Sequence, residues 1–159
     1  MSQLNQLVQR LITARVEFVL VGGFAAIAHG VSLMTQDVDV CCPFNPENIR
    51  GIHGAVADLH PVHRMTPQKL PFVWSLELCA GLKNLYLDTD FGPLDCLSSV
   101  LGVGEFDEVK RRSIQAPLAI GTCLLLDIDA LIDAKFATNR PRDRMTILQL
   151  KAIKERKGL

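Results

Sequence analysis

The stretch FVLVGGFAAIAHGVSLMTQDVDV, residues 18–40, decides the fold of this chain. Its apolar start, taken over residues 17–21, predicts a short buried strand. Gly22 and Gly23 interrupt that strand, and residues 24–30 predict a short helix that ends near a further glycine. The segment is therefore predicted to run from a strand, through a glycine pair, into a helix.

Residues 37–42, DVDVCC, predict a second strand, because acidic and apolar residues alternate at its start. Successive side chains of a strand point to opposite faces, so Asp37 and Asp39 project together, roughly 6.6 Å apart along the backbone. Val38 and Val40 then point to the other, buried face. Two carboxylates held side by side repel each other unless a cation lies between them. Mg²⁺ is the expected cation, since it prefers carboxylate oxygens and phosphate, and a site for two ions needs bridging carboxylates of this kind.

The glycine pair supplies a place for a phosphate group. Because Gly22 and Gly23 have no Cβ atoms, the backbone there can come close to a ligand. The helix that follows offers unpaired N–H groups and the positive end of its dipole. A glycine turn followed by an Asp-x-Asp strand therefore predicts a site for a metal-bound nucleoside triphosphate. An ordinary strand-to-helix turn and a solvated strand end are the alternative interpretations of these two features.

A third carboxylate is needed to complete the metal site or to orient an attacking hydroxyl. Asp95, in GPLDCL, is the best candidate, because it is a single acid between apolar residues, as on a buried strand. Asp88 and Asp90 compete for this role, since they also lie two residues apart. They are expected at a strand end beside Gly92, where solvated acids are common. A hydrogen-bonded structural role is the alternative for Asp95.

The rest of the chain predicts a mixed α/β order with helices at both ends. The predicted elements are a helix whose buried stripe is Leu4, Leu7, Val8, Leu11 and Ile12, a helix from Asn45 to about His60, a loop over 61–71, strand candidates at 72–79, 84–90 and 93–99, a helix at 105–112, short strands within 114–128, and two helices from Asp129 onward around Asn139-Arg140-Pro141. The length of 159 residues suits one domain, with a core over about 15–125 and a helical tail over about 127–157.

Composition restricts the partners and the setting. The net charge is formally zero, so the chain as a whole has no electrostatic attraction to nucleic acid or to an anionic membrane. No apolar run approaches the roughly 20 residues that a transmembrane helix needs, and the N-terminus has the pattern of an amphipathic helix rather than a signal peptide. The five cysteines form no Cys-x-x-Cys pair and are odd in number, which favours a reduced, cytoplasmic setting.

These elements together resemble the polymerase-β-like nucleotidyltransferase superfamily. The shared pattern is an apolar residue, two glycines, 13 intervening residues and then Asp-Val-Asp-Val. The resemblance is greatest for the small bacterial branch that contains the nucleotidyltransferase toxins of abortive-infection (AbiEii-like) systems. It extends over about residues 15–150: LYLDTDFGPLDCLSSVLGVGEFDEV resembles the third-carboxylate segment of that branch, and LLLDIDALIDAKFATNRPRDRMTILQL resembles its helical tail, with a Lys and an Arg-x-x-Asp.

The resemblance implies a minimal nucleotidyltransferase fold, a mixed β-sheet flanked by helices with a C-terminal helical tail. It also implies transfer of a nucleoside monophosphate from an NTP to a hydroxyl, on an RNA 3′ end such as that of tRNA or on a protein, with two Mg²⁺ ions. The matching positions are Gly22 and Gly23 for the phosphate turn, Asp37 and Asp39 for the metal pair, Asp95 for the third acid, and Lys135 for the tail lysine that approaches the triphosphate. Thr35 either contacts the nucleotide or caps the start of the Asp-x-Asp strand.

One departure from the family pattern leaves the activity open. Many relatives carry an Arg two residues before the Thr of this motif, and here that position is Leu33. A missing cation there would weaken NTP binding. The alternative is therefore a catalytically degenerate binding or regulatory module, as part of a toxin–antitoxin pair. A purely structural α/β protein with surface acids is the third interpretation, and it requires the resemblance to be chance.

The basic residues near the C-terminus also have two interpretations. Residues 135–157 hold eight Lys or Arg residues against Asp143 and Glu155. Such a run is usually a solvated helix face, but it can also attract a polyanionic acceptor such as tRNA. Lys135 itself can be a snorkelling helix residue without a ligand. The four histidines match no common zinc spacing, which favours structural or surface roles.

Overall fold

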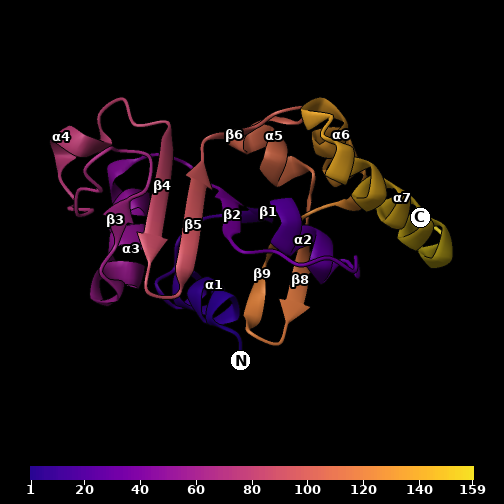
Figure 1. The fold of residues 1–159 in the computed structure, drawn as a ribbon, viewed down its shortest axis with the longest axis horizontal. Coiled ribbons are helices and arrows are strands. Elements are labelled where there is room, and N and C mark those ends of the chain that lie inside the picture. The colour runs from indigo at the N-terminus through magenta and orange to yellow at the C-terminus, as the bar shows by residue number, and fades with distance from the viewer.

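A seven-stranded mixed sheet forms the centre of the computed structural model, which describes residues 1–159 (Figure 1). The strand order is β3-β4-β5-β2-β1-β9-β8, and a separate ribbon pairs β6 with β7. The strands are β1 (Val19–Val21), β2 (Val38–Cys41), β3 (Val62–His63), β4 (Asn84–Thr89), β5 (Gly92–Leu97), β6 (Ser99–Val100), β7 (Gly104–Glu105), β8 (Ser113–Leu118) and β9 (Gly121–Leu126). The predicted mixed sheet flanked by helices is therefore confirmed.

The helices flank this sheet, and two of them form the C-terminal end of the chain (Figure 1). They are α1 (Gln3–Thr13), α2 (Gly22–Ala28), α3 (Pro46–Val56), the 3₁₀ turn η1 (Ala57–Leu59), α4 (Leu76–Cys79), α5 (Phe106–Arg111), α6 (Ile128–Thr138) and α7 (Pro141–Lys157). Figure 1 shows α6 and α7 at the opposite end of the molecule from β3 and α4. The two predicted C-terminal helices are confirmed. No helix here combines the length and apolarity needed to cross a bilayer.

The register of the central strands decides which residues meet. Strand β2 runs antiparallel to β1 and parallel to β5. Asp39 on β2 is paired with Val21 on one side and with Asp95 on the other. Because cross-strand partners share a face of the sheet, the two acids are neighbours although 56 positions separate them in the sequence.

The apolar face of the sheet holds the core. Val38, Val40, Leu94 and Cys96 have no exposed surface. Helix α1 contacts β2, β5 and β9, and its buried side chains are Leu7, Val8 and Leu11. All five cysteines are buried and unpaired, as expected for small apolar core residues. Burial of this face leaves the alternate positions of β2 and β5 for polar side chains on the other face.

Two expectations between residues 61 and 79 are wrong. The segment 61–71, predicted as a loop, contains β3, which pairs with the edge of β4. The segment 72–79, predicted as a strand, consists of an irregular stretch over 72–75 and then helix α4. Ser75 begins that helix by accepting a hydrogen bond from the backbone of Leu78, 3.0 Å away. A serine cap therefore outweighs the apolar alternation on which the strand prediction was based.

Candidate active site

The glycine pair lies inside the first turn of a helix. Helix α2 begins at Gly22 itself, so the prediction of a helix starting at residue 24 placed its start too late. Gly22 has a φ of +67°, a conformation that other residues rarely adopt. A Cβ atom here would also overlap the Oδ2 atom of Asp39. Two independent observations, the positive φ and the lack of space for a Cβ atom beside Asp39, therefore restrict this position to glycine.

Three predicted acids converge next to that turn. Asp37, Asp39 and Asp95 each offer a carboxylate oxygen, and these oxygens all lie within 4.8 Å of one another. The three residues, here called the acid cluster, are only partly exposed. Asp39 and Asp95 meet because β2 and β5 are adjacent and parallel, and Asp37 directly precedes β2.

The competing acids of the β4–β5 hairpin have other partners. Asp88 accepts a hydrogen bond from the ammonium of Lys69 at 3.4 Å. Asp90 pairs with Nδ1 of His60 at 2.6 Å, and both of those side chains are largely exposed. Neither acid belongs to the cluster, so the structure brings Asp95 and not its competitors to the Asp-x-Asp strand.

Mutual repulsion shapes the titration of the acid cluster. Desolvation, the charges of Asp37 and Asp95 and a hydrogen bond with Asp95 raise the pKa of Asp39 to about 7, against which the charge of Lys135 acts. Desolvation also raises the pKa of Asp95, although the hydrogen bond and charge of Arg64 oppose it. The cluster thus carries more negative potential than the protein alone compensates at neutral pH.

The donor set fits a hard divalent cation. Three carboxylates within 4.8 Å present several oxygens and no sulfur or nitrogen donor. Mg²⁺ takes such oxygens and keeps open positions for phosphate. A cation would also offset the desolvation and the carboxylate repulsion that raise the pKa of Asp39. Asp37, Asp39 and Asp95 are therefore the residues that would hold Mg²⁺ in this chain.

Thr35 supports the first acid of the pair. Its hydroxyl donates to the backbone carbonyl of Asp37 at 3.1 Å and lies 3.4 Å from the Oδ1 atom of the same residue. A Cβ atom on Gly23 would lie 3.2 Å from this hydroxyl and 3.7 Å from Leu33. Of the two expectations for Thr35, the contacts present are those of a residue that braces the start of the strand. Leu33 presents an apolar side chain to the glycine turn.

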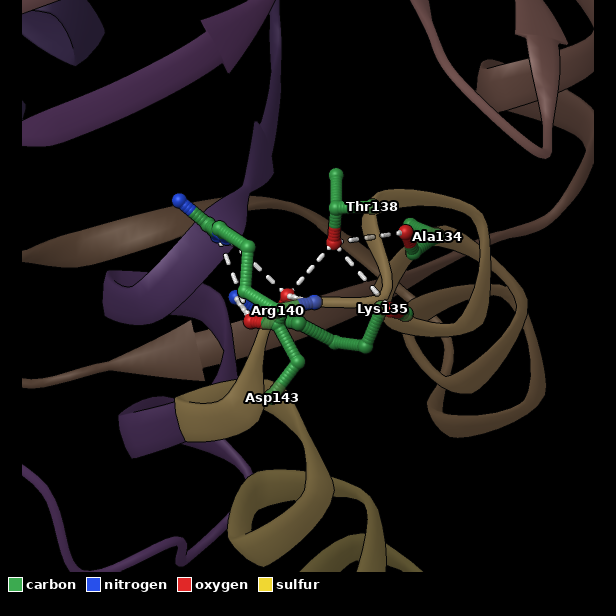
Figure 2. A network of polar contacts seen from close by, with 5 residues as sticks. All are labelled: Ala134, Lys135, Thr138, Arg140 and Asp143. Carbon is green, nitrogen blue, oxygen red and sulfur yellow. Dashed lines mark hydrogen bonds and ion pairs between the residues drawn. The ribbon is translucent and has the colours of Figure 1, made fainter.

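Lys135 approaches the cluster from helix α6 and is held by a buried acid (Figure 2). Its ammonium lies 3.5 Å from Oδ1 of Asp143 and is largely buried. Asp143 is only 1% exposed. Its Oδ2 atom accepts hydrogen bonds from the Thr138 hydroxyl at 2.7 Å and from the backbone N–H and Nε of Arg140, both at 3.0 Å. The lysine is thus fixed in place, and its positive charge acts on Asp39.

The electrostatics of Asp143 show that it stays ionised. Desolvation alone would raise the pKa of Asp143, but the hydrogen bonds from Arg140 and Thr138 and the charge of Lys135 outweigh it and hold the pKa well below its usual range. The Arg-x-x-Asp spacing at the start of helix α7, with Pro141 in the first turn, is the sequence signal of this network. The sequence alone did not assign Asp143 a role.

Arg64 is a further residue at the cluster that the sequence did not indicate. Its Nη2 donates to Oδ1 of Asp95 at 2.5 Å, and its Nη1 donates to the carbonyl of Leu87 at 3.3 Å. It lies just after β3, within the proline-containing segment predicted as a loop.

The buried His29 has a structural role, because its Nε2 lies 2.8 Å from the carbonyl oxygen of Leu126.

Comparison with known proteins supports the fold. Neither a family model nor a curated protein sequence matches the chain. The solution structure of the antibiotic-resistance factor ANT(2″)-Ia is similar with a TM-score of 0.59 and 16% identity, over 95% of this chain and 82% of that one. The crystal structure of ANT(2″)-Ia in complex with adenylyl-2″-tobramycin is similar with a TM-score of 0.58 and 15% identity, over 95% and 94% of the two chains.

These likenesses define the class of fold. The neighbours have the polymerase-β-like nucleotidyltransferase fold, and this chain shares their mixed sheet over nearly its whole length. At 15–16% identity these likenesses show the fold alone. The acceptor and the particular reaction must be inferred from the residues of this chain.

Proposed function

We propose that this protein transfers a nucleoside monophosphate from an NTP to a hydroxyl at the 3′ end of an RNA. The observation that carries the proposal is the acid cluster: three carboxylates within 4.8 Å of one another, beside a glycine turn, on a nucleotidyltransferase fold. Asp37, Asp39 and Asp95 would hold Mg²⁺, which when bound neutralises negative charge on the triphosphate.

The chain's own groups have distinct roles in the proposed reaction. The backbone at Gly22 and Gly23 and the start of α2 receive the phosphates. The ammonium of Lys135, held by Asp143, adds positive charge on the side of the helical tail. Asp95 accepts the proton of the attacking hydroxyl. The hydroxyl oxygen forms a bond to the α-phosphorus, the bond from that phosphorus to the bridging oxygen breaks, and pyrophosphate leaves with the electron pair.

Exposed cations support a polyanionic acceptor. Lys154 pairs with Asp129 and Arg140 with Asp143, so these two are already engaged. The cations of α7 that project into solvent are Arg142, Arg144, Lys151, Arg156 and Lys157. Because the chain as a whole is neutral, this helix is a local positive surface. Such a surface attracts phosphate backbones, because binding releases counterions from the nucleic acid. The attraction weakens as the salt concentration rises, since this release then gains less free energy.

A labelling experiment tests the proposed reaction. Each α-³²P-labelled NTP is incubated with the protein, Mg²⁺ and total cellular RNA, and the products are separated from free nucleotide. Asp37→Asn with Asp39→Asn should abolish labelling of RNA while the fold is retained, because two of the three metal-binding carboxylates are lost. The control is Asp88→Asn with Asp90→Asn, which changes another pair of acids two residues apart, outside the cluster.

The outcomes separate the competing functions. Label on a protein instead of RNA would move the proposal to a protein hydroxyl as acceptor. If the Asp37 and Asp39 double variant labelled RNA as strongly as the wild type, the assignment of the acid cluster as the active site would be refuted. Absence of Mg²⁺-dependent NTP binding in calorimetry would favour the regulatory module, for which the apolar Leu33 beside the glycine turn is the supporting observation.

The toxin role follows from the same proposal and has its own test. Modification of tRNA 3′ ends would block aminoacylation, so expression of the wild-type chain should arrest bacterial growth. The double variant of Asp37 and Asp39 should not. Arrest that persists in the double variant would separate toxicity from nucleotidyl transfer.

A further inference from the structure

A row of polar side chains crosses β2, β5 and β4 and ends at the residue after β3, on the face that carries the acid cluster. Asp39 on β2 is paired with Asp95 on β5, and Asp95 is paired with Tyr86 on β4. The backbone N–H of Arg64, just beyond β3, donates to the carbonyl of Tyr86 at 2.9 Å. Since paired residues share a face, the row Asp39, Asp95, Tyr86, Arg64 extends from the cluster to the edge of the sheet.

The outer part of the row, Tyr86 and Arg64, lies on the far side of the cluster from the glycine turn. In the strand order, β1 with Gly22 lies on one side of β2, while β5, β4 and β3 lie on the other. In phosphoryl transfer the attacking and leaving oxygens are roughly in line, on opposite sides of the phosphorus. With the triphosphate at the glycine turn, the acceptor hydroxyl approaches across Asp95, Tyr86 and Arg64.

Arg64 covers the acid that receives the hydroxyl proton. Its guanidinium lies 2.5 Å from Oδ1 of Asp95 and 5.7 Å from the centre of the Tyr86 ring. The side chains of Arg64 and Asp95 are 26% and 13% exposed, so a ligand can reach both. While this pair is closed, one oxygen of Asp95 is occupied by a guanidinium rather than by the acceptor.

We propose that Arg64 is an acceptor-binding residue that leaves Asp95 and takes the phosphodiester next to the attacking hydroxyl when RNA binds. This inference rests on the proposed function and names the group that the acceptor must carry. A planar guanidinium matches two oxygens of a phosphate, and a charge-assisted pair of this kind is stronger than a neutral hydrogen bond. The exchange leaves both oxygens of Asp95 for the hydroxyl proton and the metal site.

The test removes the positive charge of Arg64 from the protein and the negative charge of the last linkage from the RNA. The acceptors are a short single-stranded RNA and the same RNA with a neutral methylphosphonate at its last linkage. The proteins are the wild type, Arg64→Gln, Arg64→Lys and the control Lys69→Gln, which removes an exposed cation of the same sheet edge that pairs with Asp88 instead. Transfer efficiency, NTP affinity and thermal stability are measured for each.

The expected result is a loss of discrimination. The methylphosphonate lowers the transfer efficiency of the wild type and of Lys69→Gln by about 10–100-fold. Arg64→Gln transfers poorly to both RNAs with nearly equal efficiency and binds NTP normally, and Arg64→Lys recovers part of the preference. A merely structural role for Arg64 would lower both transfers and leave their ratio unchanged.

Two results overturn the inference, and they are distinguishable. If the wild type labels RNA but Arg64→Gln keeps the full preference for the charged linkage, Arg64 does not bind that phosphate. If the wild type labels neither RNA with any of the four NTPs, the proposed function itself fails, and the inference fails with it.

Discussion

Asp39 should make the metal-free protein less stable at alkaline pH, and Asp39→Asn should remove that cost. The pKa of Asp39 is raised to about 7, mainly by desolvation and by the charges of Asp37 and Asp95. In the unfolded chain an aspartate titrates near pH 4. Between about pH 4 and pH 7 the folded chain therefore holds a proton that the unfolded chain has released. The free energy of unfolding falls as the pH rises through this window and levels off above it.

The magnitude follows from the displacement of the pKa. About three pH units at about 1.36 kcal/mol each correspond to a loss of roughly 4 kcal/mol above pH 7. Water around this partly exposed carboxylate screens some of the repulsion, so a loss of about 2–3 kcal/mol is expected. Asn has nearly the same shape and carries no charge. At about pH 8 the Asp39→Asn protein should be more stable than the wild type by that amount, and at about pH 5 the difference should shrink to roughly 1 kcal/mol, because only about one of the three pH units has then been crossed.

Urea denaturation with EDTA at both pH values measures the difference. The control is Asp88→Asn, because Asp88 lies on the neighbouring strand but outside the cluster and pairs with an exposed lysine. Its effect should be small and similar at both pH values. The reasoning is refuted if Asp39→Asn is no more stable than the wild type at the alkaline pH.

Three more predictions concern the glycine turn, the lysine network and the metal. Gly22→Ala should destabilise the fold by about 1–3 kcal/mol and abolish Mg²⁺ binding, because of its positive φ and the overlap with Asp39, whereas Gly54→Ala, with open space around it, should be neutral or slightly stabilising in thermal melts. Asp143→Asn should cost about 3–5 kcal/mol at neutral pH, since it removes the charged partner of the largely buried Lys135 and of Arg140. This cost should shrink as the pH falls below about 4, because a carboxyl of lowered pKa loses its stabilising effect between its unfolded and its folded pKa; urea titrations across pH measure this. Mg²⁺ should raise the melting temperature of the wild type at alkaline pH but not that of Asp39→Asn, and an equal rise in both would place the ion elsewhere.

Local signals account for the part of the site that the sequence predicts correctly. The glycine turn and the acids at 37 and 39 belong to one continuous strand–helix–strand segment, so their spacing alone sets their geometry. Asp95 follows from a single acid between apolar neighbours, which indicates a strand with one polar face. The three acids meet as predicted, although their catalytic roles remain a proposal.

The parts that were missed depend on long-range pairing or on caps. Arg64 meets Asp95 only because β3, a strand of two residues, adds to the edge of β4, and no local pattern announces so short a strand. Helix α4 was missed because the apolar residues at 72–79 alternate like a strand, while Ser75 begins a helix. The buried role of Asp143 depends on the docking of α6 beside α7.

The acid cluster lies on central strands and Arg64 lies at the edge of the sheet, which has a consequence for how this protein can diverge. The strands beside the glycine turn and the acids, β1, β2 and β5, are central, whereas Arg64 follows directly after the peripheral β3. Peripheral segments tolerate insertion and replacement better than central ones. An exchange of residues 60–75 is therefore expected to change the proposed acceptor preference while the acid cluster and the glycine turn are retained.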